Sequence, residues 1–188
     1  MRWLILHARS RQVPASAAAV LFVALALWAF TGSGPVGLGT AVQILAANVA
    51  AGSIGLGGWD LVLERTAAIR WVPRRAAHVL LIGAFASAAL LAVQAVGPEI
   101  APAGAVVRTS AGLVGLAALG AALFGAHVGW ILPTGWLGFT LLVPPPGGVV
   151  GEVAGWMLYS PSTTASTATP WVLLGVGTVV YAVAGPRR

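Results

Sequence analysis

Charged side chains are concentrated in residues 59–78, WDLVLERTAAIRWVPRRAAH, which hold two carboxylates and four arginines. Elsewhere charge is scarce, because charged residues make up only 7% of the chain. Glu64, Arg65 and Arg70 lie close together in this segment, and charged side chains give orientation and specificity to a contact with a second protein. Arg74 and Arg75 fit either that contact or an anchor on lipid phosphate. The segment is therefore a candidate docking site for a soluble protein.

The composition decides what kind of molecule presents this segment. Hydrophobic residues make up 59% of the 188 residues and the mean hydropathy is +0.93, more than a soluble domain of this size shows. The apolar runs are continuous rather than alternating, which favours helices over the strands of a membrane barrel. We expect an all-α integral membrane protein with a single transmembrane domain over residues 1–188.

Six apolar stretches are candidates for membrane-spanning helices. They are residues 15–32, 38–58, 76–96, 106–126, 127–143 and 170–184. The last two are short and Pro133 interrupts the fifth, so a re-entrant fifth segment is the alternative. With six spans, nine of the ten arginines fall on the side of the two termini and only Arg108 falls on the other. The positive-inside rule then predicts a multi-pass protein of the cytoplasmic membrane with both termini in the cytoplasm.

Two segments outside these stretches have a pattern of their own. Residues 1–14 combine apolar residues with Arg9 and Arg11, which predicts a helix lying on the cytoplasmic surface of the membrane. A disordered basic tail is the alternative, and residues 1–34 also allow a signal-peptide interpretation. Residues 144–169 form a long extracytoplasmic loop, either solvated or dipping back into the membrane as a re-entrant element between the fifth and sixth helices.

Missing residues exclude several kinds of chemistry. The chain has no cysteine and no lysine, which excludes disulfides, Cys-ligated zinc and a standard ATP-binding P-loop. The three histidines are far apart, so we expect no catalytic residue, no metal site and no cofactor bound by this chain. The arginines flank apolar runs, so nucleic acid is not an expected partner. All four acids lie outside the cores of the predicted spans, which disfavours a proton- or sodium-coupled carrier.

A few polar or small residues within the spans are candidates for lining a pathway or joining helices. Gln43, Asn48 and Thr140 are possible pathway-lining residues, although such side chains more often hold membrane helices together. Small residues form two ridges that allow close packing within the chain or between two copies. The ridges are Ala47/Ala51/Gly55 and Ala117/Ala121/Gly125/Gly129.

Taken as a helix, residues 61–71 would lie along the membrane surface, with their charged side chains toward the cytoplasm. This arrangement resembles the exporter-type permease subunits of ATP-binding-cassette transporters, in the class whose membrane domain is a separate six-helix chain. After the second span, that family often has a Glu-Arg pair followed by proline and basic residues. The matching residues here are Glu64, Arg65, Pro73, Arg74 and Arg75, and a later similarity covers Trp156, Leu158, Pro161, Ser162 and Thr163. The chain departs from the family at residues 66–68, Thr-Ala-Ala, where Gly-Thr is usual.

The resemblance implies a membrane subunit that forms the export pathway with a second copy of itself or a homologous permease. It implies that residues 59–75 contain a coupling helix, with Glu64, Arg65 and Arg70 contacting cytosolic ATPase subunits. ATP and magnesium would be bound by those partner chains, and lipid would surround the membrane body. Two other functions remain open: a non-transporting scaffold that recruits a cytosolic protein through the same segment, and an ion-coupled carrier.

Overall fold

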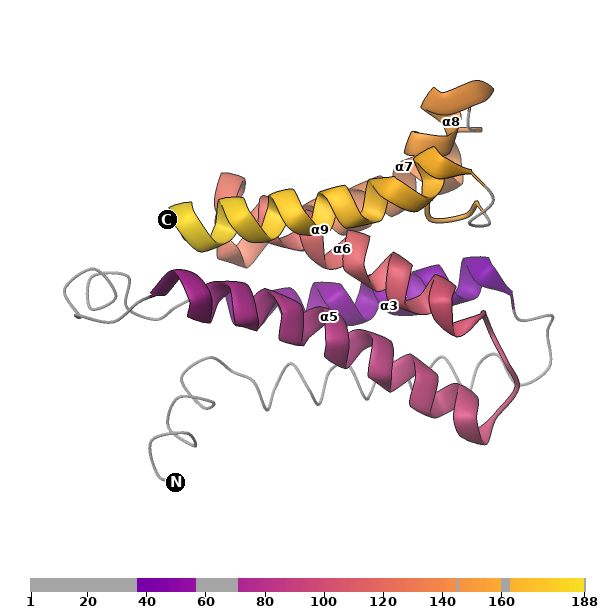
Figure 1. Ribbon diagram of the computed structural model, residues 1–188, viewed down its shortest axis with the longest axis horizontal. Coiled ribbons are helices and arrows are strands. Elements are labelled where there is room, and N and C mark those ends of the chain that lie inside the picture. Colours follow the sequence, from indigo (N-terminus) through magenta and orange to yellow (C-terminus); the bar gives the residue numbers. More distant parts are fainter. Residues whose placement is uncertain (1–36, 57–70, 145, 160–162, 188) are drawn as a thin grey trace.

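A computed structural model describes residues 37–56, 71–144, 146–159 and 163–187 (Figure 1). Within these ranges every regular element is a helix, as the composition predicts. The elements are α3 (Leu38–Ser53), η1 (Ile54–Leu56), α5 (Trp71–Val96), α6 (Ala103–Phe124), η2 (Ala126–Val128), α7 (Ile131–Leu142), α8 (Gly148–Ala154) and α9 (Thr164–Ala184). The predicted interfacial helix, residues 1–14, and the predicted first span, residues 15–32, lie outside the described residues.

Four of the described helical stretches are long and apolar enough to cross a membrane. They are Leu38–Leu56, Trp71–Val96, Ala103–Phe124 and Thr164–Ala184. These match the second, third, fourth and sixth predicted spans, which supports a multi-pass membrane protein. α5 begins at Trp71 rather than at residue 76, so Arg74 and Arg75 lie within its helical start and not in a separate loop. The described end of the predicted coupling segment is therefore the beginning of a long helix.

The fifth predicted span, residues 127–143, differs most from its prediction. Gly125 has φ of 110°, a backbone conformation that glycine adopts readily, and it ends α6. The chain then forms η2 and the separate α7, which has 12 residues. At about 1.5 Å per residue α7 is roughly 18 Å long, against a hydrocarbon core of about 30 Å. This stretch is thus not a single helix of membrane-spanning length.

The predicted loop 144–169 is largely helical in its described parts. α8 occupies Gly148–Ala154, and α9 begins at Thr164 instead of Pro170. The Thr163 side chain caps α9 by accepting a hydrogen bond from the Ser166 backbone nitrogen at 3.4 Å. The Thr167 and Thr169 hydroxyls donate to carbonyls one turn back, at 2.9 and 2.7 Å. These Ser and Thr side chains, which fall in the predicted loop, instead supply local hydrogen-bond partners for the first turns of the helix.

α6 lies at the centre of the bundle and is buried along most of its length (Figure 1). It packs against α3, α5, α7 and α9. Its closest approach is to α9, where glycines let the two backbones meet: a Cβ at Gly177 would overlap the Gly115 carbonyl oxygen, and one at Gly115 would overlap the Leu173 carbonyl. The small-residue ridge on α6 is also internal, because Ala117 and Ala121 are 0% exposed.

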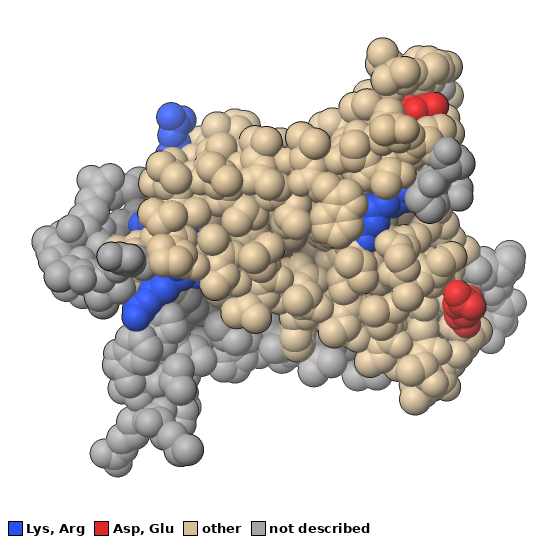
Figure 2. All heavy atoms as spheres, in the orientation of Figure 1, with Lys and Arg blue, Asp and Glu red and all other residues tan. Residues whose placement is uncertain are grey.

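The described arginines are concentrated at one end of the bundle. Figure 2 shows blue side chains at the left end, where α5 begins and α9 ends, and red side chains together with a smaller blue area toward the right end, where α8 lies. The left end carries Arg74 and Arg75 on α5 and Arg187 after α9. The two described acids are Glu99 and Glu152. We call the left end the arginine-rich end.

Candidate functional site at the arginine-rich end

The predicted docking residues Glu64, Arg65 and Arg70 fall in residues 57–70, outside the described part of the chain. Their contacts with a partner therefore stay predictions. The structure does describe both residues at which this segment joins the bundle, Leu56 at the end of η1 and Trp71 at the start of α5. We call Leu56 and Trp71 the two anchors of this segment.

The first anchor is held by two side chains from other helices. The Tyr181 hydroxyl on α9 donates to the Leu56 carbonyl oxygen at 2.6 Å, and Tyr181 and Leu56 are 1% and 0% exposed. His78 Nε2 on α5 lies 3.0 Å from the Gly55 carbonyl oxygen; because a carbonyl only accepts, Nε2 carries the hydrogen. These carbonyls end a helix and lack partners within it. We call this set, Gly55, Leu56, His78 and Tyr181, the η1 clamp.

The second anchor, at the start of α5, carries two adjacent arginines with different surroundings. Arg75 Nη1 donates to the Ala182 carbonyl oxygen at 3.4 Å, where α9 ends. A guanidinium there faces the negative end of a helix dipole, which is a stabilising arrangement. Arg74 is exposed, and its guanidinium carbon lies 5.9 Å from the centre of the Trp71 ring. Arg75 thus joins α5 to α9, whereas Arg74 is exposed beside the Trp71 ring.

The end of α6 is fastened at the same end of the bundle. The Arg187 backbone nitrogen donates to the Ala121 carbonyl oxygen at 3.3 Å, and Arg187 Nη1 donates to the Leu123 carbonyl oxygen at 3.3 Å. Together with the η1 clamp and Arg75, these bonds join the ends of η1, α5, α6 and α9. Sequence reasoning missed this network, because the acceptors of all these bonds are backbone carbonyls.

The three predicted pathway residues do not form one surface. Gln43 on α3 is exposed, whereas Asn48 on the same helix is 0% exposed. Thr140 on α7 is buried, and its hydroxyl donates to the Trp136 carbonyl oxygen at 2.8 Å. Among the residues that the structure describes, neither the oxygen nor the nitrogen of the Asn48 amide has a hydrogen-bond partner. Asn48 therefore lowers the stability of the folded protein, because a buried amide without hydrogen-bond partners destabilises a fold.

Replacing Asn48 by leucine, a side chain of similar size, is expected to stabilise the protein. Removing an unsatisfied buried amide should raise the free energy of unfolding by about 1 kcal/mol. Thermal unfolding of the purified protein in detergent measures this, with Asn48→Asp as the matched variant that should destabilise. A lower stability for Asn48→Leu would mean that the amide has partners in the folded protein.

Arg108 is a buried charge that sequence reasoning treated only as a topology marker. It lies near the start of α6, is 3% exposed, and its Nη2 donates to the Tyr159 carbonyl at 2.7 Å and the Trp156 carbonyl at 3.4 Å. Trp156, 0% exposed, packs its ring where a Cβ at Gly112 would lie. Arg108 and Gly112 thus fix the turn between α8 and α9 onto α6. The sequence feature that could have indicated this role is a single arginine inside an apolar run.

The described acids give no support to ion coupling or metal binding. Glu99 is exposed and Glu152 is partly exposed, so neither lies in the core. Among the residues that the structure describes, no three histidine, cysteine or acidic side chains are grouped so as to hold a metal ion.

Comparison of the chain with protein-family models gives no match, and comparisons with curated proteins and with solved structures give none either. The functional argument therefore depends on the residues and their geometry.

Proposed function

We propose that this chain is the membrane-spanning permease subunit of an ATP-driven exporter in the cytoplasmic membrane. Residues 59–75 would receive motion from separate cytosolic ATPase subunits, and the pathway would lie between this chain and a second permease copy. The observation that carries the proposal is the network at the arginine-rich end. Residues 57–70 connect two anchors, Leu56 and Trp71, whose helices are hydrogen-bonded to each other and to α9.

The network supports coupling for a mechanical reason. A force on residues 57–70 acts on Leu56 and Trp71, and the η1 clamp and Arg75 pass it to α5 and α9. Packed elements joined in this way move as rigid bodies rather than bending locally. A partner that closes on the segment would therefore tilt long helices, which is the motion that alternating exposure of a pathway requires.

Charge reversal at Glu64 tests the proposal. We expect Glu64→Arg to abolish copurification of the cytosolic ATPase chain and the ATPase activity of the reconstituted complex, since an interface tolerates like charges poorly. The matched control is Glu99→Arg, the same substitution at an exposed site that follows the other end of α5. Unchanged ATPase coupling in Glu64→Arg, or the absence of any copurifying ATPase with the unmodified chain, would contradict the proposal.

A scaffold that recruits a cytosolic protein through the same segment is the second candidate. The closed interior of the described helices favours it, because α6 is buried on nearly all sides and Asn48 has no exposed surface. The same copurification separates the two functions. A scaffold should retain a partner that depends on Glu64, yet neither ATPase stimulation nor ATP-dependent transport into vesicles should follow.

A further inference from the structure

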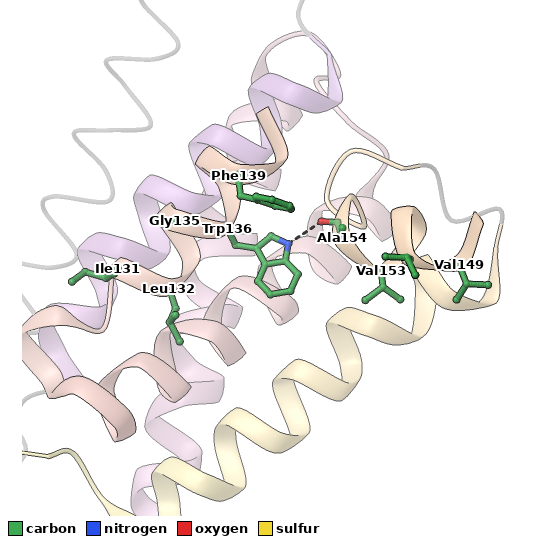
Figure 3. A pocket seen from close by; sticks show the side chains of 9 residues that line it. Ile131, Leu132, Gly135, Trp136, Phe139, Val149, Val153 and Ala154 are labelled. Atoms are coloured by element: carbon green, nitrogen blue, oxygen red, sulfur yellow. Dashed lines mark hydrogen bonds between the residues drawn. The ribbon is translucent and has the colours of Figure 1, made fainter. Parts of the chain in front are cut away.

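An apolar groove runs between α7 and α8 and has a volume of about 640 Å³ (Figure 3). Residues from both helices line it, including Ile131, Gly135, Trp136, Phe139, Val149 and Val153. The polar atom among these side chains, Trp136 Nε1, already donates to the Ala154 carbonyl oxygen at 2.9 Å. The groove therefore offers apolar contact and no free hydrogen-bonding side chain.

The groove is open at the surface of the bundle. Val149 and Val150 are 66% and 70% exposed, and Phe139 is 48% exposed. Such a contiguous apolar surface is unfavourable in water, so its natural environment is hydrocarbon or an apolar ligand. The neighbouring α6 and α9 are both long and apolar enough to cross a membrane, so the bilayer supplies that environment.

The short α7 explains why a groove exists here. Its 12 residues cover only part of the hydrocarbon thickness, and α8 lies beside it, joined to it by the hydrogen bond from Trp136 to Ala154. A bilayer must fill the notch beside a helix shorter than its hydrophobic core, because an empty apolar space loses all its contacts. Glu152 on α8 is partly exposed, and a carboxylate next to a membrane belongs at head-group depth. The groove thus begins near the head groups and continues along α7 toward the hydrocarbon.

We propose that this groove is a binding site for one acyl chain of a bilayer lipid. An acyl chain is long, narrow and flexible, and it needs no hydrogen-bond partner from the groove. The volume of the groove falls in the range of small-ligand pockets. This proposal requires only that the protein is embedded in a bilayer, and it does not depend on an ATPase partner.

Photolabelling with a defined lipid tests the site. The full-length protein is reconstituted in vesicles that contain phosphatidylcholine with a diazirine in its acyl chain, and the labelled peptides are mapped by mass spectrometry. We expect α7 and α8 to be labelled more strongly than the exposed face of α5, at Leu80 and Leu81. When excess unmodified lipid is added before irradiation, the labelling should fall only slowly, as expected for a bound acyl chain that exchanges slowly with the bilayer.

Two glycines on α7 provide a blocking variant and its control. A Cβ at Gly135 or at Gly138 meets nothing within 4 Å, so both positions accept a side chain, but only Gly135 lines the groove. Gly135→Leu should lower α7 and α8 labelling to the level of the α5 face, whereas Gly138→Leu should leave it unchanged. Val153→Trp blocks the groove from α8 and serves if Gly135→Leu does not fold.

Three results would overturn the proposal. The first is labelling of α7 and α8 no stronger than that of α5. The second is strong labelling that both blocking variants leave intact. The third is the absence of label together with a dimer that Gly135→Leu converts to monomer in mild detergent, because a second copy of the chain would then occupy the groove.

Discussion

Gly177→Ala is expected to prevent stable folding. The added methyl group would overlap the Gly115 backbone carbonyl on α6, and a backbone atom cannot move aside as a flexible side chain can. The two most extensively packed helices would have to separate, at a cost of about 3 kcal/mol or more. Size-exclusion chromatography and thermal unfolding in detergent should show an aggregated protein, or one that unfolds at a much lower temperature.

Gly175, on the same helix, is the matched control. A Cβ there meets nothing within 4 Å, so Gly175→Ala should leave the packing intact and, because alanine favours helices, slightly raise stability. Equal behaviour of the two alanine variants would show that α6 and α9 do not approach each other at Gly115.

Arg108→Ala is expected to have the second-largest effect. It removes the donor for the Trp156 and Tyr159 carbonyls and leaves a space beside α6. The lost charged hydrogen bonds and the unfilled space together should lower the free energy of unfolding by about 2–4 kcal/mol. Limited proteolysis should then cut between α8 and α9 faster in this variant than in the unmodified protein.

Arg187→Ala provides the comparison for Arg108. Arg187 is exposed and its guanidinium makes a longer bond, 3.3 Å, so its loss should change thermal unfolding little. Arg108→Lys should retain part of the stability, because an ammonium can reach one carbonyl but lacks the planar fork of arginine. If Arg108→Ala proved as mild as Arg187→Ala, the turn would be held by Trp156 packing alone.

The long apolar helices could be predicted from the sequence because hydrocarbon leaves a spanning chain few alternatives to helix. Boundaries were less predictable. α5 begins at Trp71 and α9 at Thr164, since charged and hydroxyl side chains are tolerated at helix starts, where the apolar pattern gives no information. The break at Gly125 and the short α7 depend on packing against α6, which composition does not reveal.

The docking role of Glu64, Arg65 and Arg70 stays a prediction. The arginine distribution predicted that Arg74, Arg75 and Arg187 lie at the same end of the bundle, as they do in the structure. It did not separate Arg74 from Arg75, which differ because only Arg75 faces the end of α9. Tyr181 and His78 bind backbone carbonyls that only the folded chain brings within reach. The pattern of side chains in the sequence therefore does not predict their roles.

The contact between α6 and α9 also has a consequence for biogenesis. α9 follows the other described helices in the sequence, so the ribosome synthesises it after them. α6 is therefore complete before α9 is available to pack against it. Until α9 is synthesised, the glycine face of α6 lacks the helix that covers it. Assembly of the central contact is therefore a late event of synthesis, and chains that stop short of α9 should be recognised and degraded by membrane proteases.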